Sequence, residues 1–303
     1  SDKGKSQFEF EINKTIINID TNKPEKSEEL LLKEKYSLSL EQLNWRRWTI
    51  QNKCDGDSEL FCQEYPSDDT EAFLVSGRPV FDRKATTQYA LNTKKPIAVG
   101  NLELRDREVS FNSNEKGYLK VWEKPKTGKS YVIGADVAEG LEKGDYSSAQ
   151  VLERQSLEQV AEWHGHLDAD LFGAELNKLG HYYNKCLVGC EVNNHGLTSL
   201  TTLKNLLYPR IYYRKTYDQK IQKEINKIGW KTDLRTKPLM IDDLGKSIRE
   251  NLLILNGKEV IDELTTYVRD ADGKTCAQNG AFDDRLIALA IAIQVRNSNW
   301  LLQ

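Results

Sequence analysis

The sequence lacks the features of membrane-spanning and disulfide-stabilised proteins. No uninterrupted apolar run in its 303 residues approaches the roughly 18 residues of a membrane span, and its first residues form no apolar signal region. The five cysteines are odd in number and form no Cys-x-x-Cys pair, and none of the four histidines completes a zinc-finger spacing. We therefore expect a soluble globular protein with free thiols that acts in the cytoplasm and does not bind membranes.

A phosphate-binding loop for ATP is also missing. The string Gly-Lys-Ser occurs at Gly4, Gly128 and Gly245. A Walker A loop needs another glycine five positions earlier, where Glu123 and Met240 stand before the second and third strings, and the first has no sequence that far upstream. The sequence therefore predicts no ATPase activity for this chain.

The overall charge does not indicate a nucleic-acid binder, because 43 basic residues face 46 acidic ones. Between residues 205 and 239, however, the local charge is +6, and four tyrosines and Trp230 are interleaved. Such a mixture suits phosphate contacts and base stacking, although a solvated surface explains the composition equally well. The candidate DNA-binding residues in this segment are Arg210, Arg214, Lys215, Lys220, Lys231 and Arg235.

The chain divides by pattern near residue 95. Before it we expect a strand over residues 8–12, a helix capped by Ser39 and Gln42, a short helix over 70–74 and a polar connection over 82–96. Residues 96–303 read as one α/β domain, starting with strands over 101–104, 109–112 and 118–122. Residues 1–95 are expected to form a small, mostly helical N-terminal part.

The second part alternates β-branched strands with amphipathic helices. Strands over 131–137, 147–152 and 160–166, joined by short loops, predict an antiparallel meander. A helix capped by Asp168, strands over 187–192 and 211–213 with a helix between them, and a helix starting near Pro238 and ending before Gly257 follow. The last helix is almost entirely apolar after Asp283 and Asp284, so it must be buried.

Four carboxylates stand where apolar elements end or begin: Asp136, Glu191, Asp283 and Asp284. If the two strands are neighbours and the last helix crosses them, these acids converge, and several ionised carboxylates can share a site only with a cation. Oxygen ligands favour Mg²⁺ or Mn²⁺, and two such ions would activate a water against a phosphodiester. The sequence thus predicts a metal-dependent phosphodiester hydrolase.

Each acid taken alone has an ordinary structural explanation. Asp283 suits a helix N-cap, Asp136 a turn at a strand end, and Glu191 a cap of the following helix. Asp145 suits the turn over residues 143–145. Only the order strand-Asp, meander, strand-Glu and apolar helix with a leading Asp favours a site over these explanations.

That order resembles ribonuclease-H-like nucleases, and one branch matches in more detail. The strings GYLKVWEKP (117–125), YVIGADVAEG (131–140), GDYS (144–147), EVNNHG (191–196), IGWKT (228–232) and TKPL (236–239) resemble phage terminase large subunits, as does the closing Asp-Asp pair. Upstream, EQLNWRR (41–47), QEYP (63–66), EAF (71–73) and SG (76–77) resemble the end of the ATPase region of those proteins. The resemblance covers most of the chain from Ser39 onward.

The resemblance implies a ribonuclease-H-like mixed central sheet flanked by helices, preceded by a remnant of the ATPase region. Catalytic and metal-binding roles fall on Asp136, Glu191 and Asp284, with Asp283 and Asp145 as further metal ligands. The segment before Trp230 falls where the family has a mobile hairpin near the active site. His195 is a further candidate near the site, although it equally suits a helix entry.

The resemblance implies an endonuclease that cuts concatemeric viral DNA during genome packaging. It would use Mg²⁺ or Mn²⁺, and its specificity for DNA sequence would be low. Its partners would be double-stranded DNA, the portal protein and the small terminase subunit, in the host cytoplasm. Three alternatives remain: another ribonuclease-H-like nuclease such as a Holliday-junction resolvase or transposase core, a non-catalytic module that grips DNA, and an actin-like ATP-binding fold. The last lacks the glycine-rich phosphate loops that it would need.

Overall fold

The computed structural model describes residues 29, 32, 33, 36–56, 58, 61, 64, 65, 78–106, 108–138, 146–193, 195–218, 222–270, 272–278 and 280–298. The chain forms two compact units, Ser1–Ser76 and Gly77–Gln303. The strand expected over residues 8–12 and the helix expected over 70–74 lie outside the described residues.

The first unit contains helix α2 (Leu40–Lys53), which begins as the sequence predicts. The Ser39 hydroxyl accepts a hydrogen bond from the Gln42 N–H at 3.3 Å, and the Gln42 side chain accepts one from the Ser39 N–H at 2.8 Å. This reciprocal capping box satisfies two N–H groups that the first turn leaves without helical partners. Leu43 and Thr49 are the buried residues of this helix.

The second unit begins at Gly77, before the boundary near residue 95 that the sequence suggested. Strand β1 (Arg78–Pro79) pairs with a later strand of this unit, and helix α5 (Arg83–Leu91) occupies the stretch that was predicted to be connective. The prediction of a connection was wrong. Helix α5 is mostly polar and buries only Thr86 and Tyr89, so its sequence lacks the apolar periodicity that indicates a helix. The Asp82 side chain caps it by accepting from the Ala85 N–H at 2.8 Å.

A seven-stranded mixed sheet forms the centre of this unit, as predicted. Its order is β3 (Glu108–Ser113), β2 (Ala98–Arg105), β4 (Leu119–Val121), β7 (Gln159–Gly165), β6 (Ser147–Glu153), β5 (Tyr131–Asp136) and β8 (Leu187–Cys190). The predicted meander β5–β6–β7 is antiparallel, and β8 runs parallel to β5. Ile211 continues the sheet beyond β8 by an isolated parallel bridge to Val188. This order is that of the expected ribonuclease-H-like fold.

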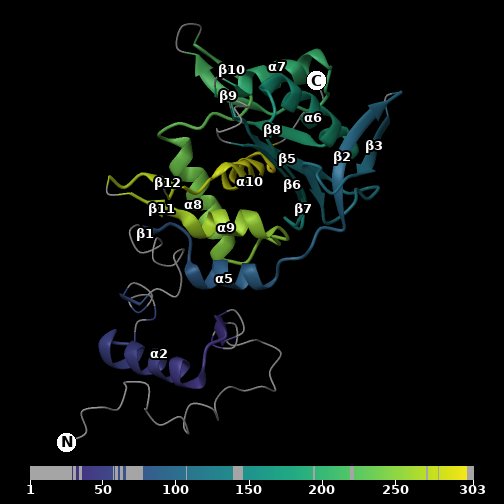
Figure 1. Ribbon diagram of the computed structural model, residues 1–303. Coiled ribbons are helices and arrows are strands. Elements are labelled where there is room, and N and C mark those ends of the chain that lie inside the picture. The colour runs from purple at the N-terminus through teal and green to yellow at the C-terminus, as the bar shows by residue number, and fades with distance from the viewer. Residues whose placement is uncertain are drawn as a thin grey trace, which may run out of the picture. The chain divides into compact units, whose positions relative to one another are not determined.

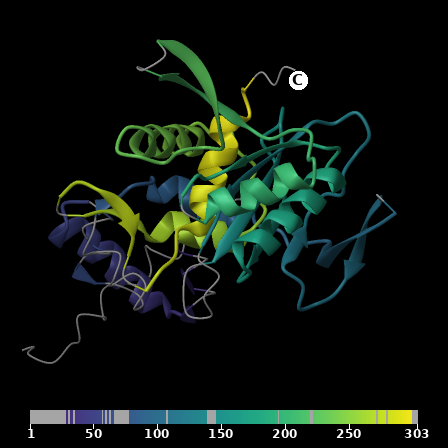
Figure 2. The ribbon, with the colours of Figure 1, turned by 90° about the horizontal axis from the view of Figure 1, so that it is seen from above.

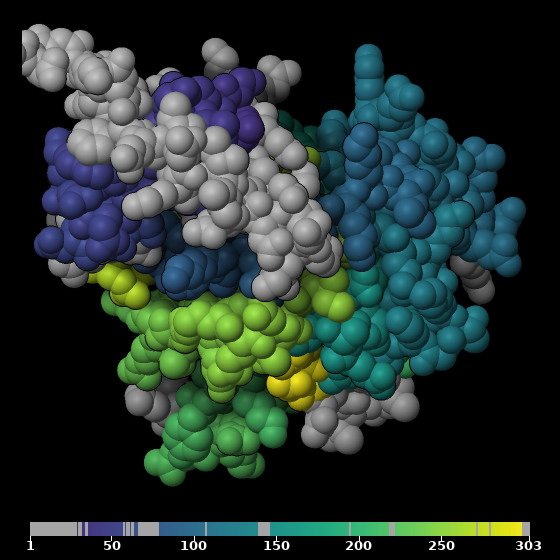
Figure 3. All heavy atoms as spheres, turned by 90° about the horizontal axis from the view of Figure 1, so that it is seen from below, coloured from purple at the N-terminus to yellow at the C-terminus, as the bar shows by residue number. Residues whose placement is uncertain are grey.

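Helices cover both faces of the sheet (Figure 1). One face packs against α6 (Ala169–Tyr182) and α7 (Gly196–Asn205), and the other against α8 (Thr236–Arg249), α9 (Lys258–Thr266) and α10 (Asp284–Val295). Figure 2 shows α10, in yellow, running through the middle of the unit. Figure 3 shows yellow atoms of the C-terminal part of the chain reaching the surface between the yellow-green α9 and the teal strands. Helix α10 lies directly on β5, β6 and β8.

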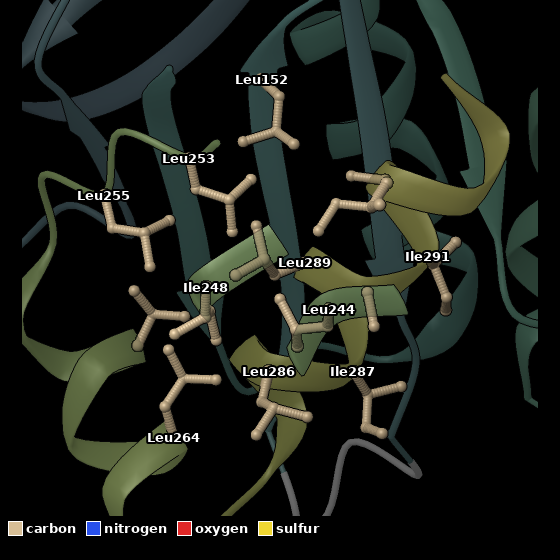
Figure 4. Packing of buried hydrophobic residues seen from close by; sticks show 14 of the residues in the cluster. Leu152, Leu244, Ile248, Leu253, Leu255, Leu264, Leu286, Ile287, Leu289 and Ile291 are labelled. Atoms are coloured by element: carbon tan, nitrogen blue, oxygen red, sulfur yellow. The ribbon is translucent and has the colours of Figure 1, made fainter. Parts of the chain in front are cut away.

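The core on the α10 side explains why that helix is almost wholly apolar. Leu286, Leu289 and Ile291 pack with Leu244 and Ile248 of α8, as Figure 4 shows. Because α10 lies between the sheet and α8, apolar side chains are needed around most of its circumference. Each fully buried Leu or Ile contributes roughly 1.5–3 kcal/mol.

Three local expectations need correction. Gly257 does not end the preceding helix but stands at the N-cap position of α9, a helix that the sequence did not predict. The hairpin β11 (Tyr267–Arg269) and β12 (Thr275–Ala277) was also missed, because its strands are only three residues long. Asp168 occupies the N-cap position of α6, but its side chain makes no capping hydrogen bond.

The basic segment forms a separate antiparallel hairpin, β9 (Tyr213–Asp218) and β10 (Lys223–Ile228). It projects from the rest of the unit at the top of Figure 1. The predicted strand over residues 211–213 is therefore shared between the bridge at Ile211 and the first residue of β9.

Within the described residues, no helix has both the length and the apolar character needed to cross a membrane. Cys186, Cys190 and Cys276 are free thiols, as expected.

Candidate active site

The parallel neighbours β5 and β8 carry the same short pattern, a glycine followed two residues later by an acid. Gly134 of β5 and Gly189 of β8 are register partners, and Asp136 and Glu191 follow them. Successive residues of a strand point to opposite faces, so each acid lies on the face of its glycine. Asp136 and Glu191 therefore leave the sheet side by side on one face.

That face is the one covered by α10, and the glycines allow a close approach. A Cβ added at Gly134 would lie 2.1 Å from the Ala288 carbonyl oxygen and 2.2 Å from the Ala292 nitrogen. Asp284 is one helical turn before Ala288, so it lies on the helix side that faces the sheet. The Asp284 residue is only 6% exposed. The helix thus brings its first carboxylate to the end of β5.

The electrostatics place the four acids in one site. Burial raises the pKa of Asp136 well above its usual value, and the hydrogen bond with Glu191 and the charges of Glu191, Asp284 and Asp283 raise it further. Asp283 stands at the N-cap position of α10 without a capping hydrogen bond from its side chain, so capping does not explain it. The four acids predicted from the sequence are therefore brought together, whereas Asp145 lies outside the described residues.

Asn193 ties Glu191 to the end of β5. Its side-chain amide donates to the Val137 carbonyl at 2.9 Å and to the Glu191 carboxylate at 3.3 Å, and its carbonyl oxygen accepts from the Gly196 N–H at 2.6 Å. A Cβ at Gly196 would lie 1.9 Å from the Glu191 carbonyl oxygen, so only glycine fits there. No role was predicted for Asn193, although it lies within the string EVNNHG.

A buried ionic network anchors the first turn of α10. The Arg285 guanidinium donates to Glu162 of β7 at 3.1 Å and to Glu263 of α9 at 2.8 Å. The second oxygen of Glu263 accepts from the Leu286 N–H at 2.9 Å. Burial raises the pKa of Glu263 to about 8, against the opposing effect of Arg285. The sequence analysis missed this network, and the one signal for it was Glu162, the only acidic residue of a buried strand.

The donor set at the four acids is entirely carboxylate oxygen, which is the chemistry that Mg²⁺ and Mn²⁺ prefer. A cation between them would offset the repulsion between carboxylates that helps to raise the pKa of Asp136. As the described side chains lie, no group of three or more His, Cys, Asp or Glu residues has the geometry to hold a metal ion. The residue types fit a divalent cation, and their side chains would have to close around it.

The other candidates are more dispersed. His195 stands at the N-cap position of α7, and its side chain makes no capping hydrogen bond. Arg214 donates to the Ile228 and Gly229 carbonyls at 2.6 and 2.9 Å, so it fastens the base of the hairpin. Lys231 pairs with Asp233 at 3.7 Å.

Lys215 and Arg235 are exposed, Arg210 is partly buried, and Lys220 lies outside the described residues. The DNA-binding role of this basic group stays a prediction.

A cavity of about 570 Å³ lies between the start of α8 and the β11–β12 hairpin. Its walls include Leu234, Pro238, Ile241, Arg269 and Lys274, and none of the four acids. The cavity is therefore not the acid site.

No protein-family model matches the sequence, and no curated protein matches it significantly. The structure is similar to solved terminase nuclease domains. The large terminase nuclease of thermophilic phage G20c with bound cobalt aligns at a TM-score of 0.48 and 18% identity, over 69% of this chain and 96% of that one. The Thermus phage P74-26 large terminase nuclease domain aligns at a TM-score of 0.47 and 17% identity, over 72% of this chain and 98% of that one.

The human cytomegalovirus terminase nuclease domain, manganese-soaked and inhibitor-bound, aligns at a TM-score of 0.43 and 9% identity, over 72% of this chain and 96% of that one. The phage G20c nuclease is also known with bound magnesium and zinc.

Proposed function

We propose that the chain is a metal-dependent DNA endonuclease that cuts concatemeric viral DNA during genome packaging. The observation that supports this most is the meeting of Asp136, Glu191 and Asp284 from β5, β8 and α10 at one end of the central strands. Three or four carboxylates held on apolar elements destabilise the fold unless a cation joins them. A role in binding cations explains why this arrangement is built.

The residues divide the work by position. Asp136 and Glu191 leave neighbouring strands and are positioned to hold a shared cation, while Asp284 and Asp283 approach from the helix. When bound, one or two Mg²⁺ or Mn²⁺ ions would activate a water and stabilise the leaving oxygen of the phosphodiester. Asn193 orients Glu191, and the Arg285 network holds the first turn of α10 in place. No side chain serves as a covalent nucleophile.

Double-stranded DNA would reach the acids along the projecting β9–β10 hairpin. Lys215, Lys223 and Lys227 are exposed on its two strands. Contacts of this kind hold phosphates and do not read bases, so cleavage should be largely independent of sequence.

In the full packaging motor, we propose that the portal protein and the small terminase subunit restrain the cut, in the host cytoplasm. The unit Ser1–Ser76 would be the end of an ATPase region, and this chain would not hydrolyse ATP.

The test is cleavage of supercoiled plasmid by the whole chain with Mn²⁺, Mg²⁺ or EDTA, beside Asp136→Ala, Asp284→Ala and the exposed control Asp262→Asn. We expect nicking and linearisation with metal, activity in the control and at least a 100-fold loss in both alanine variants. DNA binding without cleavage would indicate a gripping module. A strong preference for branched DNA would indicate a resolvase.

A further inference from the structure

The acid row continues across the sheet beyond Asp136. Ser148 of β6 is the register partner of Asp136, and His164 of β7 is the register partner of Ser148. Register partners of antiparallel strands share a face, so Asp136, Ser148 and His164 all face the α10 side. The Ser148 hydroxyl and the His164 Nε2 are buried there without hydrogen-bond partners in the structure. The site is thus wider than its four acids.

A cluster of rings, Tyr146, His164, His166 and Phe282, lies at the end of this row. The Tyr146 ring centroid is 4.4 Å from that of His164 and 3.8 Å from that of His166. Phe282 meets Tyr146 edge-on, at 5.3 Å and 86°. Stacked and edge-to-face arrangements of this kind are the favoured ones for neighbouring aromatic rings, so the rings support one another. They form a wall beside the acids.

One member of this wall faces solvent. Phe282 is 43% exposed, and it immediately precedes Asp283 and Asp284 in the chain. Tyr146, His164 and His166 are only partly exposed and lie behind it. An exposed Phe held edge-on by its neighbour, next to carboxylates, offers an apolar ring to whatever the acids bind.

We propose that Phe282, supported by the ring cluster, stacks on a base of the cleaved DNA strand next to the scissile phosphate. This inference rests on the proposed nuclease function. Stacking on an aromatic ring is tolerant of sequence because every base has a flat π-face, which agrees with cleavage that does not read sequence. A base can stack on a protein ring only when it leaves its own stack, so a mismatch or gap at that position should strengthen binding.

The test uses oligonucleotides with 2-aminopurine at successive positions, because the fluorescence of this base changes on stacking. Binding is titrated without divalent metal, and cleavage is measured with Mn²⁺ on paired and mismatched DNA. Phe282→Ala is compared with Phe282→Trp, which keeps a stacking ring, and with Ile97→Ala, which removes another exposed apolar side chain, 63% exposed.

We expect a fluorescence change at one or two positions for the wild type and the Trp variant, because the base leaves its own stack for the protein ring, and none for Phe282→Ala. The alanine variant should also raise KM for DNA about tenfold, since stacking of one base contributes about that much, with a smaller change in kcat. Cleavage without a fluorescence change at any position, or Phe282→Ala equal to wild type, would overturn the stacking proposal alone. Binding with the fluorescence change but without cleavage would contradict the nuclease and leave the stacking intact, and a folded chain that neither binds nor cleaves DNA would contradict both.

Discussion

Gly134 and Gly189 face each other across the parallel pair β5–β8, and each stands two residues before an acid of the site. At Gly134 the α10 backbone approaches so closely that a Cβ would meet the Ala288 carbonyl oxygen at 2.1 Å. At Gly189 a Cβ would meet the Val295 side chain at 2.7 Å. The two glycines therefore set how close α10 lies to the sheet, and with it the separation between Asp284 and the strand acids.

Gly134→Ala should damage both stability and activity, because a methyl group would push the α10 backbone away from β5. Overpacking of this kind costs about 1–3 kcal/mol, and a shift of the helix by about 1 Å at a catalytic group lowers the rate roughly 100-fold. Urea unfolding and Mn²⁺-dependent cleavage measure the two effects.

Gly245→Ala on α8 is the matched control, because its added Cβ would meet nothing closer than 3.4 Å. It should be neutral or slightly stabilising, since alanine favours a helix over glycine by about 1 kcal/mol. Equal effects of the two substitutions would contradict the role of Gly134.

Asp136→Asn should stabilise the metal-free protein while it abolishes cleavage. The raised pKa of Asp136 means that the native state favours its protonated form. That contribution is fully present below the pKa of the unfolded chain, near 3.8, and is lost as pH rises. The neutral amide of Asn does not ionise, so the variant does not lose this stability as pH rises. The free energy of unfolding of the variant should therefore exceed that of the wild type by about zero at pH 4 and by at least 1 kcal/mol at pH 7.

Thermal unfolding in EDTA across this pH range measures the gain, with Asp262→Asn as an exposed control. A decrease in stability at pH 7 would show that Asp136 is already compensated in the protein alone.

Arg285→Met should be among the most destabilising changes outside the apolar core. It would leave the Glu162 carboxylate, whose side chain is 0% exposed, with only the more distant Lys120 at 3.9 Å, and it would remove the cation that pairs with the buried Glu263 at 2.8 Å. Removing one partner of a buried ion pair costs about 3–5 kcal/mol. Lys258→Met, which breaks the exposed pair with Asp262, should cost less than about 1 kcal/mol. Chemical unfolding compares them, and similar losses would refute the anchoring role.

Replacing Lys215 and Lys227 of the hairpin by alanine should weaken DNA binding in a salt-dependent way. Each lost phosphate contact makes the negative slope of log K against log salt shallower by about 0.9. The slope of the double variant should therefore be shallower by up to about 1.8. Fluorescence anisotropy from low to moderate salt measures the slope. Lys84→Ala on α5, another exposed lysine, should leave it unchanged. An unaltered slope in the double variant would place the DNA path elsewhere.

The sequence predicted those elements whose pattern is strong within a short window. The apolar run after Asp284 required a buried helix, the Ser39–Gln42 box marked a helix start, and the meander followed from three β-branched strands. Helix α5 was missed because it buries so little, and α9 because Gly257 suits a helix end as well as a helix start.

The acids of the proposed site can be recognised in the sequence, but the contacts that support them cannot. Asp136, Glu191 and Asp284 stand at recognisable element ends, whereas the contacts that hold them join distant segments. Arg285 and Glu162 are 123 residues apart in the sequence, and the contacting rings of Tyr146 and Phe282 are likewise far apart in the sequence. Such pairs depend on strand register and helix placement, which no local pattern contains.

The most direct measurement is the binding of Mn²⁺ to the purified chain, by electron paramagnetic resonance and calorimetry, with wild type, Asp136→Asn, Asp284→Asn and Asp262→Asn side by side. We expect one or two bound ions in the wild type and in Asp262→Asn, and at least a tenfold weaker affinity in the other two. No bound Mn²⁺ in the folded wild type with DNA present, or equal affinity in all four proteins, would contradict the assignment of these carboxylates as the metal site of a nuclease.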